Sequence, residues 1–282
     1  MNQPETPVVD CHFHIFDAGP AAPAARYRPP YTASLREWQR LAEGLGDPFG
    51  VVVQTSFLGT DNTALLAALR AMPARLRGVA VVDPDISDAA LRELDDAGVR
   101  GIRLNLYRDA GWRRIGTAPW RALFARIAAL GWHVELHTDN GDGSTVLAAL
   151  DAALSAGDMP VVLDHFGRPG AAGVADPVFG VAAAVRAHRQ VWVKCSAPYR
   201  LVAPGAWREL AQRWLEVVGT DRLLWGTDWP WTNHEAAERA GECSELSRWP
   251  GTTPANASLN EALRWRNAAA LYGFAIAPGA AD

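Results

Sequence analysis

Short runs of apolar residues recur along the whole chain, separated by longer stretches with helical patterning. Each run is rich in Val, Leu or Ile and has the length of a β-strand. Nearly every position within a run is apolar, which is typical of parallel strands covered on both faces. The eight runs lie at residues 8–14, 51–56, 78–82, 101–106, 133–137, 161–165, 191–196 and 223–228.

Signals for the start of a helix lie between these runs. They are capping residues or a proline in the first turn, followed by Ala- and Leu-rich sequence, at residues 60–62, 87–88, 119, 176–177 and 204–205. A strand followed by a helix, repeated eight times, predicts an α/β protein with a (β/α)8 TIM barrel fold. An open doubly wound sheet is the alternative, but no glycine-rich phosphate-binding loop follows any strand.

Composition narrows the class of protein. The chain has 282 residues, of which 49% are hydrophobic and 21% charged, and this excludes disorder as the main state. The net charge of −4 indicates no basic surface for nucleic acid or anionic membranes. No apolar run is long enough to span a membrane, and no secretory signal is visible. We therefore expect one barrel domain over residues 1–282, with a frayed tail after about residue 274.

The cysteines indicate in which cellular compartment the protein is expected. Cys11, Cys195 and Cys243 are an odd number and lack CxxC spacing, so we interpret them as reduced thiols. The prediction is a cytoplasmic protein.

Side chains with catalytic chemistry gather where the predicted strands end, which is the active-site end of such a barrel. His12 and His14 end the first strand, and residues two apart share a face, so both imidazoles are expected to point into the barrel. His137 ends the fifth strand, His165 the sixth and Asp228 the eighth. Two adjacent buried imidazoles are costly without a metal or an acid as partner, which favours a functional site over simple packing.

Other polar and aromatic residues lie near these strand ends. Arg103 and Asn105 share a face of the fourth strand, and an inward-facing arginine needs an anion. Glu135 lies one layer below His137, so we expect it to support the site rather than react. Trp229 and Trp231 follow Asp228 and either wall the pocket or pack within their loop.

This ordered set of histidines and Asp228 resembles the amidohydrolase superfamily, and more narrowly its amidohydrolase 2 branch. The stretches VVDCHFHIFD, VVVQTSFLGTDN, VVLDHFGRP and LLWGTDWPWTN are similar to those of the pyrone-dicarboxylate and sugar lactonases in that branch. The similarity extends from about residue 8 to about residue 272.

The resemblance implies hydrolysis of a small polar or carboxylated lactone. Asp228 would be the general base that takes a proton from water, while His12, His14 and His165 would surround the carbonyl oxygen. Contacts with the small-molecule substrate are implied for Arg103, Arg108, Arg168, Arg200, Tyr31, Ser56 and Asn105.

The metal requirement is open at this level. The fourth strand has neither a lysine nor a glutamate, unlike binuclear members of the superfamily, which argues against two metals. His12, His14, His137 and Asp228 are suitable ligands for one divalent metal such as zinc. We expect catalysis that does not require a metal, with a single-metal site as the alternative.

Two other functions compete with this interpretation. A mononuclear metal-dependent decarboxylase of the same branch would use an overlapping set of ligands. A non-catalytic binding barrel would leave the histidines merely packed, and a converging His/Asp set is a poor stabilising device.

Overall fold

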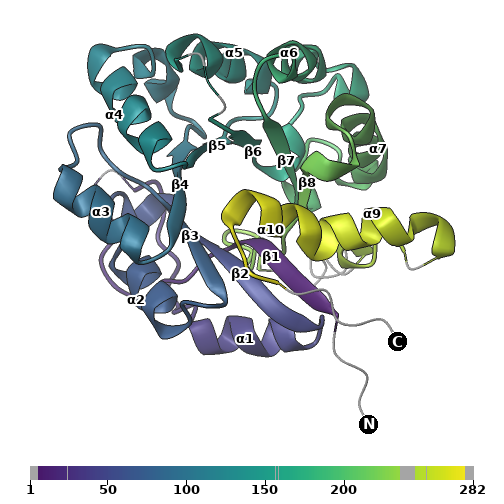
Figure 1. Cartoon of the computed structure of the whole chain (residues 1–282), viewed down its shortest axis with the longest axis horizontal. Helices are drawn as coiled ribbons and strands as arrows, with labels where there is room; N and C mark the ends of the chain where they lie inside the picture. Colours follow the sequence, from purple (N-terminus) through teal and green to yellow (C-terminus); the bar gives the residue numbers. More distant parts are fainter. Residues whose placement is uncertain are drawn as a thin grey trace.

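The computed structural model describes residues 6–276, apart from residues 24, 156, 158, 236–244 and 252. Eight parallel strands follow one another in chain order around a barrel (Figure 1). They are β1 (Pro7–Phe13), β2 (Asp47–Val53), β3 (Leu76–Ala80), β4 (Val99–Asn105), β5 (His133–His137), β6 (Val161–Leu163), β7 (Val191–Cys195) and β8 (Leu223–Trp225). The predicted (β/α)8 fold and all eight predicted strands are therefore confirmed.

Helices surround the strands (Figure 1). They are α1 (Leu35–Glu43), α2 (Thr63–Ala71), α3 (Asp88–Asp96), α4 (Ala118–Ala129), α5 (Gly143–Ala153), α6 (Pro177–Arg186), α7 (Trp207–Val218), α9 (Ala257–Glu261) and α10 (Asn267–Tyr272). Local sequence explains several starts, since Ser34, Ser87 and Asp176 each accept a hydrogen bond from the first turn of α1, α3 and α6. Helix α7 begins slightly later than predicted, because Pro204 starts a short 3-10 turn before it.

The barrel closes between β1 and the segment that follows β8. The backbone N–H of Asp228 donates to the carbonyl of His12 (2.7 Å), and that of His14 donates to the carbonyl of Trp229 (2.9 Å). The sixth and eighth strands end earlier than predicted, at Leu163 and Trp225. Beyond these ends, His165 and Asp228 adopt positive φ angles of 50° and 57°, which are incompatible with continued strand geometry.

The inside of the barrel changes character along its axis. Near the strand starts it is apolar and includes Cys11, Val51 and Trp192, and Tyr272 of α10 covers this end by packing on His133 (ring centroids 5.4 Å apart). Near the strand ends it contains buried charged and imidazole side chains. This second half contains the candidate site.

Two of the three cysteines lie within the described part of the chain. Cys11 and Cys195 are buried free thiols, while Cys243 and most of the tail after residue 274 lie outside the described residues. Among the described residues, no helix has the length and apolar character needed to cross a membrane.

Candidate active site

Asp228 lies at the centre of the histidine cluster and is fully buried. Its Oδ2 atom accepts hydrogen bonds from Arg200 Nε (2.7 Å) and from the Tyr199 hydroxyl. Its Oδ1 atom has no hydrogen-bond partner among the described residues. One carboxylate oxygen is therefore held in place, while the other is available for chemistry.

The charge state of Asp228 follows from these neighbours. Burial acts to raise the pKa of Asp228, but the Arg200 guanidinium and the nearby imidazoles outweigh burial and hold it well below its usual range. The carboxylate is thus ionised at neutral pH, and Arg200 is the largest cause.

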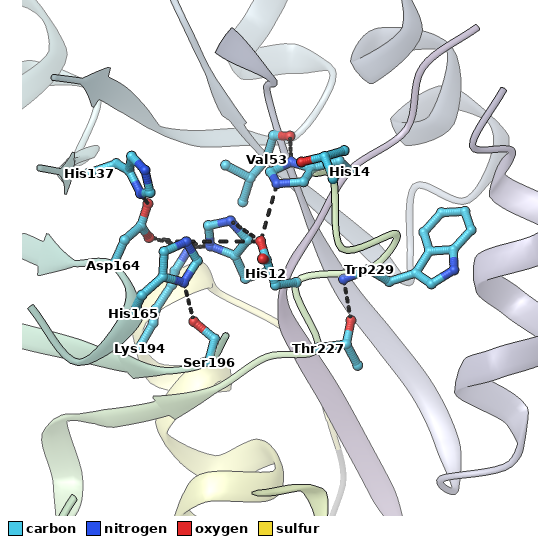
Figure 2. A network of polar contacts seen from close by, with 12 residues as sticks. His12, His14, Val53, His137, Asp164, His165, Lys194, Ser196, Thr227 and Trp229 are labelled. Carbon is cyan, nitrogen blue, oxygen red and sulfur yellow. Dashed lines mark hydrogen bonds and ion pairs between the residues drawn. The ribbon is translucent and has the colours of Figure 1, made fainter. Parts of the chain in front are cut away.

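Three imidazoles face the free Oδ1 atom of Asp228. The Nε2 atoms of His12 and His14 each lie 3.4 Å from it, and that of His165 lies 3.9 Å away. The other ring nitrogen of each is also engaged (Figure 2): His14 Nδ1 donates to the Val53 carbonyl (2.7 Å), and His165 Nδ1 contacts Ser196 Oγ (2.8 Å). These second contacts fix the orientation of the rings.

Burial determines the charge of most of these rings. It lowers the pKa of His12 to about 4, and it lowers the pKa values of His165 and His137 well below the ordinary value. These three rings are consequently neutral at neutral pH, so they act as hydrogen-bond donors, acceptors or metal ligands rather than as cations.

A layer of buried charges lies beneath the histidines. Arg103 donates to Asp164 Oδ2 through both Nε (3.0 Å) and Nη2 (2.8 Å), so the anion that Arg103 needs is supplied by the protein. Lys194 contacts Glu135 and lies 3.4 Å from His12 Nδ1. Asp164 and Lys194 were missed as site residues; the available signal for Lys194 was a single charge within an apolar strand.

A cavity of about 210 Å³ opens above this layer. Most of the predicted residues line it: His14, Ser56, Arg103, Asn105, Arg108, His137, His165, Arg200 and Asp228. Sequence reasoning missed six further lining residues, namely Arg26, Tyr27, Thr55, Tyr107, Thr232 and Asn233. Arg26 and Tyr27 belong to the long segment after β1, whose Ala- and Pro-rich sequence gives no sign of which side chain turns inward.

Some predicted residues lie away from the cavity wall. His12 is buried behind Asp228, and Arg168 is buried behind His137, with its Nη1 atom 3.3 Å from His137 Nε2. The Tyr31 hydroxyl donates to Glu235 (2.7 Å) instead of lining the cavity. Trp229 belongs to the hydrophobic core and Trp231 packs against that core, so neither lines the cavity, and the aromatic residues on its wall are Tyr27 and Tyr107.

The donor atoms around Asp228 fit a divalent metal ion. His12, His165 and Asp228 present ligand atoms within 4.8 Å of one another. The 3.4 Å separations between imidazole nitrogen and carboxylate oxygen match the edge of a zinc tetrahedron, about 3.3 Å for bonds of about 2.0 Å. His12 Nε2 and Asp228 Oδ1 are also buried without hydrogen-bond partners among the described residues.

His137, the remaining predicted ligand, lies apart from His12, His14 and Asp228. It groups with Asp164 and His165, and its Nε2 atom faces the Arg168 guanidinium. The structure thus brings His12, His14 and Asp228 together and adds His165 to them.

Comparisons with known proteins identify the family of the chain. The amidohydrolase family model matches residues 9–274. The chain is 38% identical over 244 residues to a 2-pyrone-4,6-dicarboxylate hydrolase of Comamonas testosteroni, covering 80% of this chain and 77% of that protein. It is 27% identical over 276 residues to a 4-sulfomuconolactone hydrolase of Rhizobium radiobacter, covering 94% and 89%.

A solved structure shows the same fold. It is a probable 2-pyrone-4,6-dicarboxylic acid hydrolase of Acinetobacter baumannii with citric acid bound, 30% identical to this chain. The match has a TM-score of 0.82 and covers 95% of this chain and 99% of that one. The chain therefore belongs to the amidohydrolase family, as the sequence resemblance predicted.

Proposed function

We propose that the protein hydrolyses a small anionic lactone, with Asp228 as the general base for the attacking water. The observation that carries this proposal is the buried, ionised Asp228, whose free Oδ1 atom faces the cavity among imidazole nitrogens. A carboxylate held ionised beside a small cavity is suited to accept a proton from water.

In the proposed reaction, water attacks the lactone carbonyl while Asp228 Oδ1 takes one of its protons. The negative charge that develops on the carbonyl oxygen needs a hydrogen-bond donor. His165 is suited to this role, because the Ser196 hydroxyl can donate to its Nδ1 atom and leave a proton on Nε2. The ring C–O bond then breaks, and the proton on Asp228 passes to the departing oxygen.

His14 also lines the cavity, where its Nε2 atom lies 3.4 Å from Asp228 Oδ1 and its Nδ1 atom donates to the Val53 carbonyl. We keep it among the groups around the carbonyl oxygen, as the resemblance implies. A divalent ion held by His12, His165 and Asp228 would supply a Lewis acid for the carbonyl oxygen.

The cavity walls support an anionic substrate. Arg103 and Arg200 are paired with Asp164 and Asp228. Arg26 and Arg108 also line the cavity, and neither forms an ion pair with an acidic side chain of the described residues. Two unpaired guanidinium groups favour a substrate with a carboxylate or a similar anion, in line with the names of the two relatives.

A panel of lactones tests this function. Carboxylated five- and six-membered lactones are expected to be opened, with one acid equivalent released per turnover, and neutral lactones of the same size to react more slowly. The same assays, followed for carbon dioxide release, test the decarboxylase alternative, for which the lactone-hydrolysing relatives give no support. Release of carbon dioxide without lactone opening would overturn the proposal.

We retain two further proposals from the sequence. Catalysis without a required metal is tested by chelation, which should leave lactone hydrolysis intact. A cytoplasmic location agrees with the two buried free thiols, and it is tested by fractionating cells that produce the protein.

A further inference from the structure

Lys194 is a fully buried lysine inside the barrel, and no step of the proposed reaction uses it. Its ammonium contacts Glu135 Oε2 and lies 3.4 Å from His12 Nδ1 and 3.8 Å from Asp164 Oδ1. A buried ion pair is costly to form, and apolar side chains of similar volume often stabilise a fold equally well. Its position next to His12 therefore suggests a function.

His12 Nδ1 has two neighbours of opposite chemical kind (Figure 2). Lys194 can only donate to it, because an ammonium has three N–H groups and no lone pair. Asp164 Oδ1, at 3.3 Å, can only accept when ionised. Asp164 Oδ2 accepts two hydrogen bonds from Arg103, through Nε (3.0 Å) and Nη2 (2.8 Å), which is the pairing expected of an ionised carboxylate.

The two neighbours favour different tautomers of His12. A hydrogen bond from Lys194 requires a lone pair on Nδ1, and a neutral ring then has its proton on Nε2. A hydrogen bond to Asp164 requires the proton on Nδ1. The geometry favours Lys194, since its contact with Nδ1 has hydrogen-bond geometry, whereas Asp164 Oδ1 has no hydrogen-bond partner among the described residues.

The tautomer determines what His12 presents to Asp228. An Nε2 proton points a positive dipole toward Asp228 Oδ1, 3.4 Å away. An Nε2 lone pair would face that negative oxygen and repel it, unless a cation lay between them. The second arrangement is the one that a metal ion requires.

We propose that Lys194 is a positioning residue that keeps Nδ1 of His12 free of a proton and so holds the ring proton on Nε2. Lys194 thereby turns an N–H group toward Asp228 and disfavours a divalent ion between His12 and Asp228. This inference deepens the proposed function, on which it rests for the role of Asp228. The tautomer itself is measurable whether or not the protein hydrolyses lactones.

Histidine-selective nitrogen NMR tests the proposal directly, because the two tautomers of imidazole give different patterns of ring cross-peaks. His12→Gln identifies the resonances of His12. The metal-free parent protein should show the proton on Nε2. A proton on Nδ1 in the parent would overturn the proposal without any variant of Lys194.

A double variant provides a second test of the proposal. Lys194→Met removes the donor, and Glu135→Gln avoids leaving an unpaired buried carboxylate, which would endanger folding. With Asp164 as the remaining partner at Nδ1, the proton of His12 should move to Nδ1. Zinc binding measured by calorimetry should tighten by about ten- to a hundredfold, the usual range for changes behind a metal-binding histidine.

Glu135→Gln alone is the matched control, and Asp164 Oδ1, 3.8 Å from the Lys194 ammonium, remains there as its anionic neighbour. This variant keeps Lys194, so the His12 proton should stay on Nε2 and zinc affinity should stay near that of the parent. An unchanged tautomer in the double variant would refute the role of Lys194. If the His12 proton moves in the double variant but the parent protein opens no lactone, the proposed function is wrong and the inference about Lys194 still holds.

Discussion

The two carboxylate oxygens of Asp228 have different surroundings, and this difference explains how one residue can be both held and reactive. Oδ2 is fixed by Arg200 and Tyr199, while Oδ1 faces imidazole nitrogens without a hydrogen-bond partner among the described residues. Rotation of the carboxylate would break two hydrogen bonds to a charged acceptor, each worth about 1.5–3 kcal/mol. Oδ1 is therefore directed toward the cavity, where we propose that the attacking water binds.

Arg200→Gln tests the cause of the low pKa of Asp228. In the parent, the acid limb of kcat/KM should lie below the ordinary pKa of an aspartate, because the lowered pKa keeps the base ionised. Without the guanidinium, burial dominates and raises the pKa. A pH–rate profile should then show the acid limb about 1 to 3 pH units higher. Arg108→Gln is the control and should leave the limb in place, and an unmoved limb in Arg200→Gln would contradict this cause.

Arg108→Gln itself tests recognition of the substrate anion. Its side chain lines the cavity without an acidic partner among the described residues, so it is available to a substrate carboxylate. We expect kcat/KM for a carboxylated lactone to fall by about ten- to a hundredfold, and that for a neutral lactone to change little. Arg70→Gln, an exposed change on α2, is the control. Equal losses on both lactones would argue against anion recognition.

Among single residues, the sequence predicts those that line the cavity better than those that hold them in place. His14, His165 and Asp228 line the cavity as expected, because polar residues at the ends of buried strands point to the open end of the barrel. Lys194 and Tyr199 could not be predicted, because their roles depend on partners far along the chain. Arg168 and Tyr31 lie close to the site, but side-chain direction and loop path turn them toward His137 and Glu235.

Among the elements of the fold, the turn after β8 sets the geometry of the base. Asp10 of β1 accepts hydrogen bonds from the Thr227 backbone (2.8 Å) and hydroxyl (2.6 Å), and from Trp38 Nε1 of α1 (3.0 Å). These bonds anchor the turn in which Asp228 adopts its positive φ, a conformation that costs about 1 kcal/mol or more for a residue other than glycine. Asp10 thus links the closure of the barrel, between β1 and the segment after β8, to the position of Asp228.

Gly226→Ala tests this coupling. A Cβ atom at Gly226 would lie 2.8 Å from both the Cβ and the backbone nitrogen of His12, so β8 has to move away from β1. We expect a loss of about 1–3 kcal/mol in the free energy of unfolding, together with a loss of activity as Asp228 shifts. Thermal melting and lactone assays measure the two effects.

The matched control is Gly180→Ala in α6, where a Cβ atom meets nothing within 4 Å. Alanine in a helix is favoured over glycine by about 0.5–1 kcal/mol, so this variant should be as stable as the parent or more so, with unchanged activity. An active and fully stable Gly226→Ala protein would show that the close contact does not fix the site.

The elements themselves were predictable because a buried parallel strand needs apolar residues on both faces. The ends of β6 and β8 were not, since the polar residues that follow them continue a strand-like pattern. The residues that follow include His165 and Asp228 with left-handed backbone; Asp and His are enriched in that conformation, but the preference is too weak to mark where a strand ends.

For the whole molecule, three buried ion pairs lie beneath and around the cavity. Lys194, Arg103 and Arg200 pair with Glu135, Asp164 and Asp228, respectively. Protonating the buried histidines would add positive charge inside the barrel that these three carboxylates do not neutralise.

Stability should therefore fall on acidification. The pKa of His12 is about 4 in the folded state, and those of His137 and His165 are also lowered, against about 6.5 in an unfolded chain. The unfolded state then binds protons first, so stability is lost as the pH falls from about 6.5 toward 4. Urea unfolding over this range should show a decline of up to about 1.4 kcal/mol per pH unit for each histidine. A constant free energy of unfolding down to about pH 4.5 would contradict neutral burial.

The central claim is that Asp228 is the base in lactone hydrolysis, and Asp228→Asn tests it most directly. The amide keeps the shape of the carboxylate but cannot take a proton from water. With a carboxylated lactone that the parent opens, and with folding verified by thermal melting, kcat/KM should fall by about 10² to 10⁴. A loss of only a few-fold would contradict the mechanism proposed for this site.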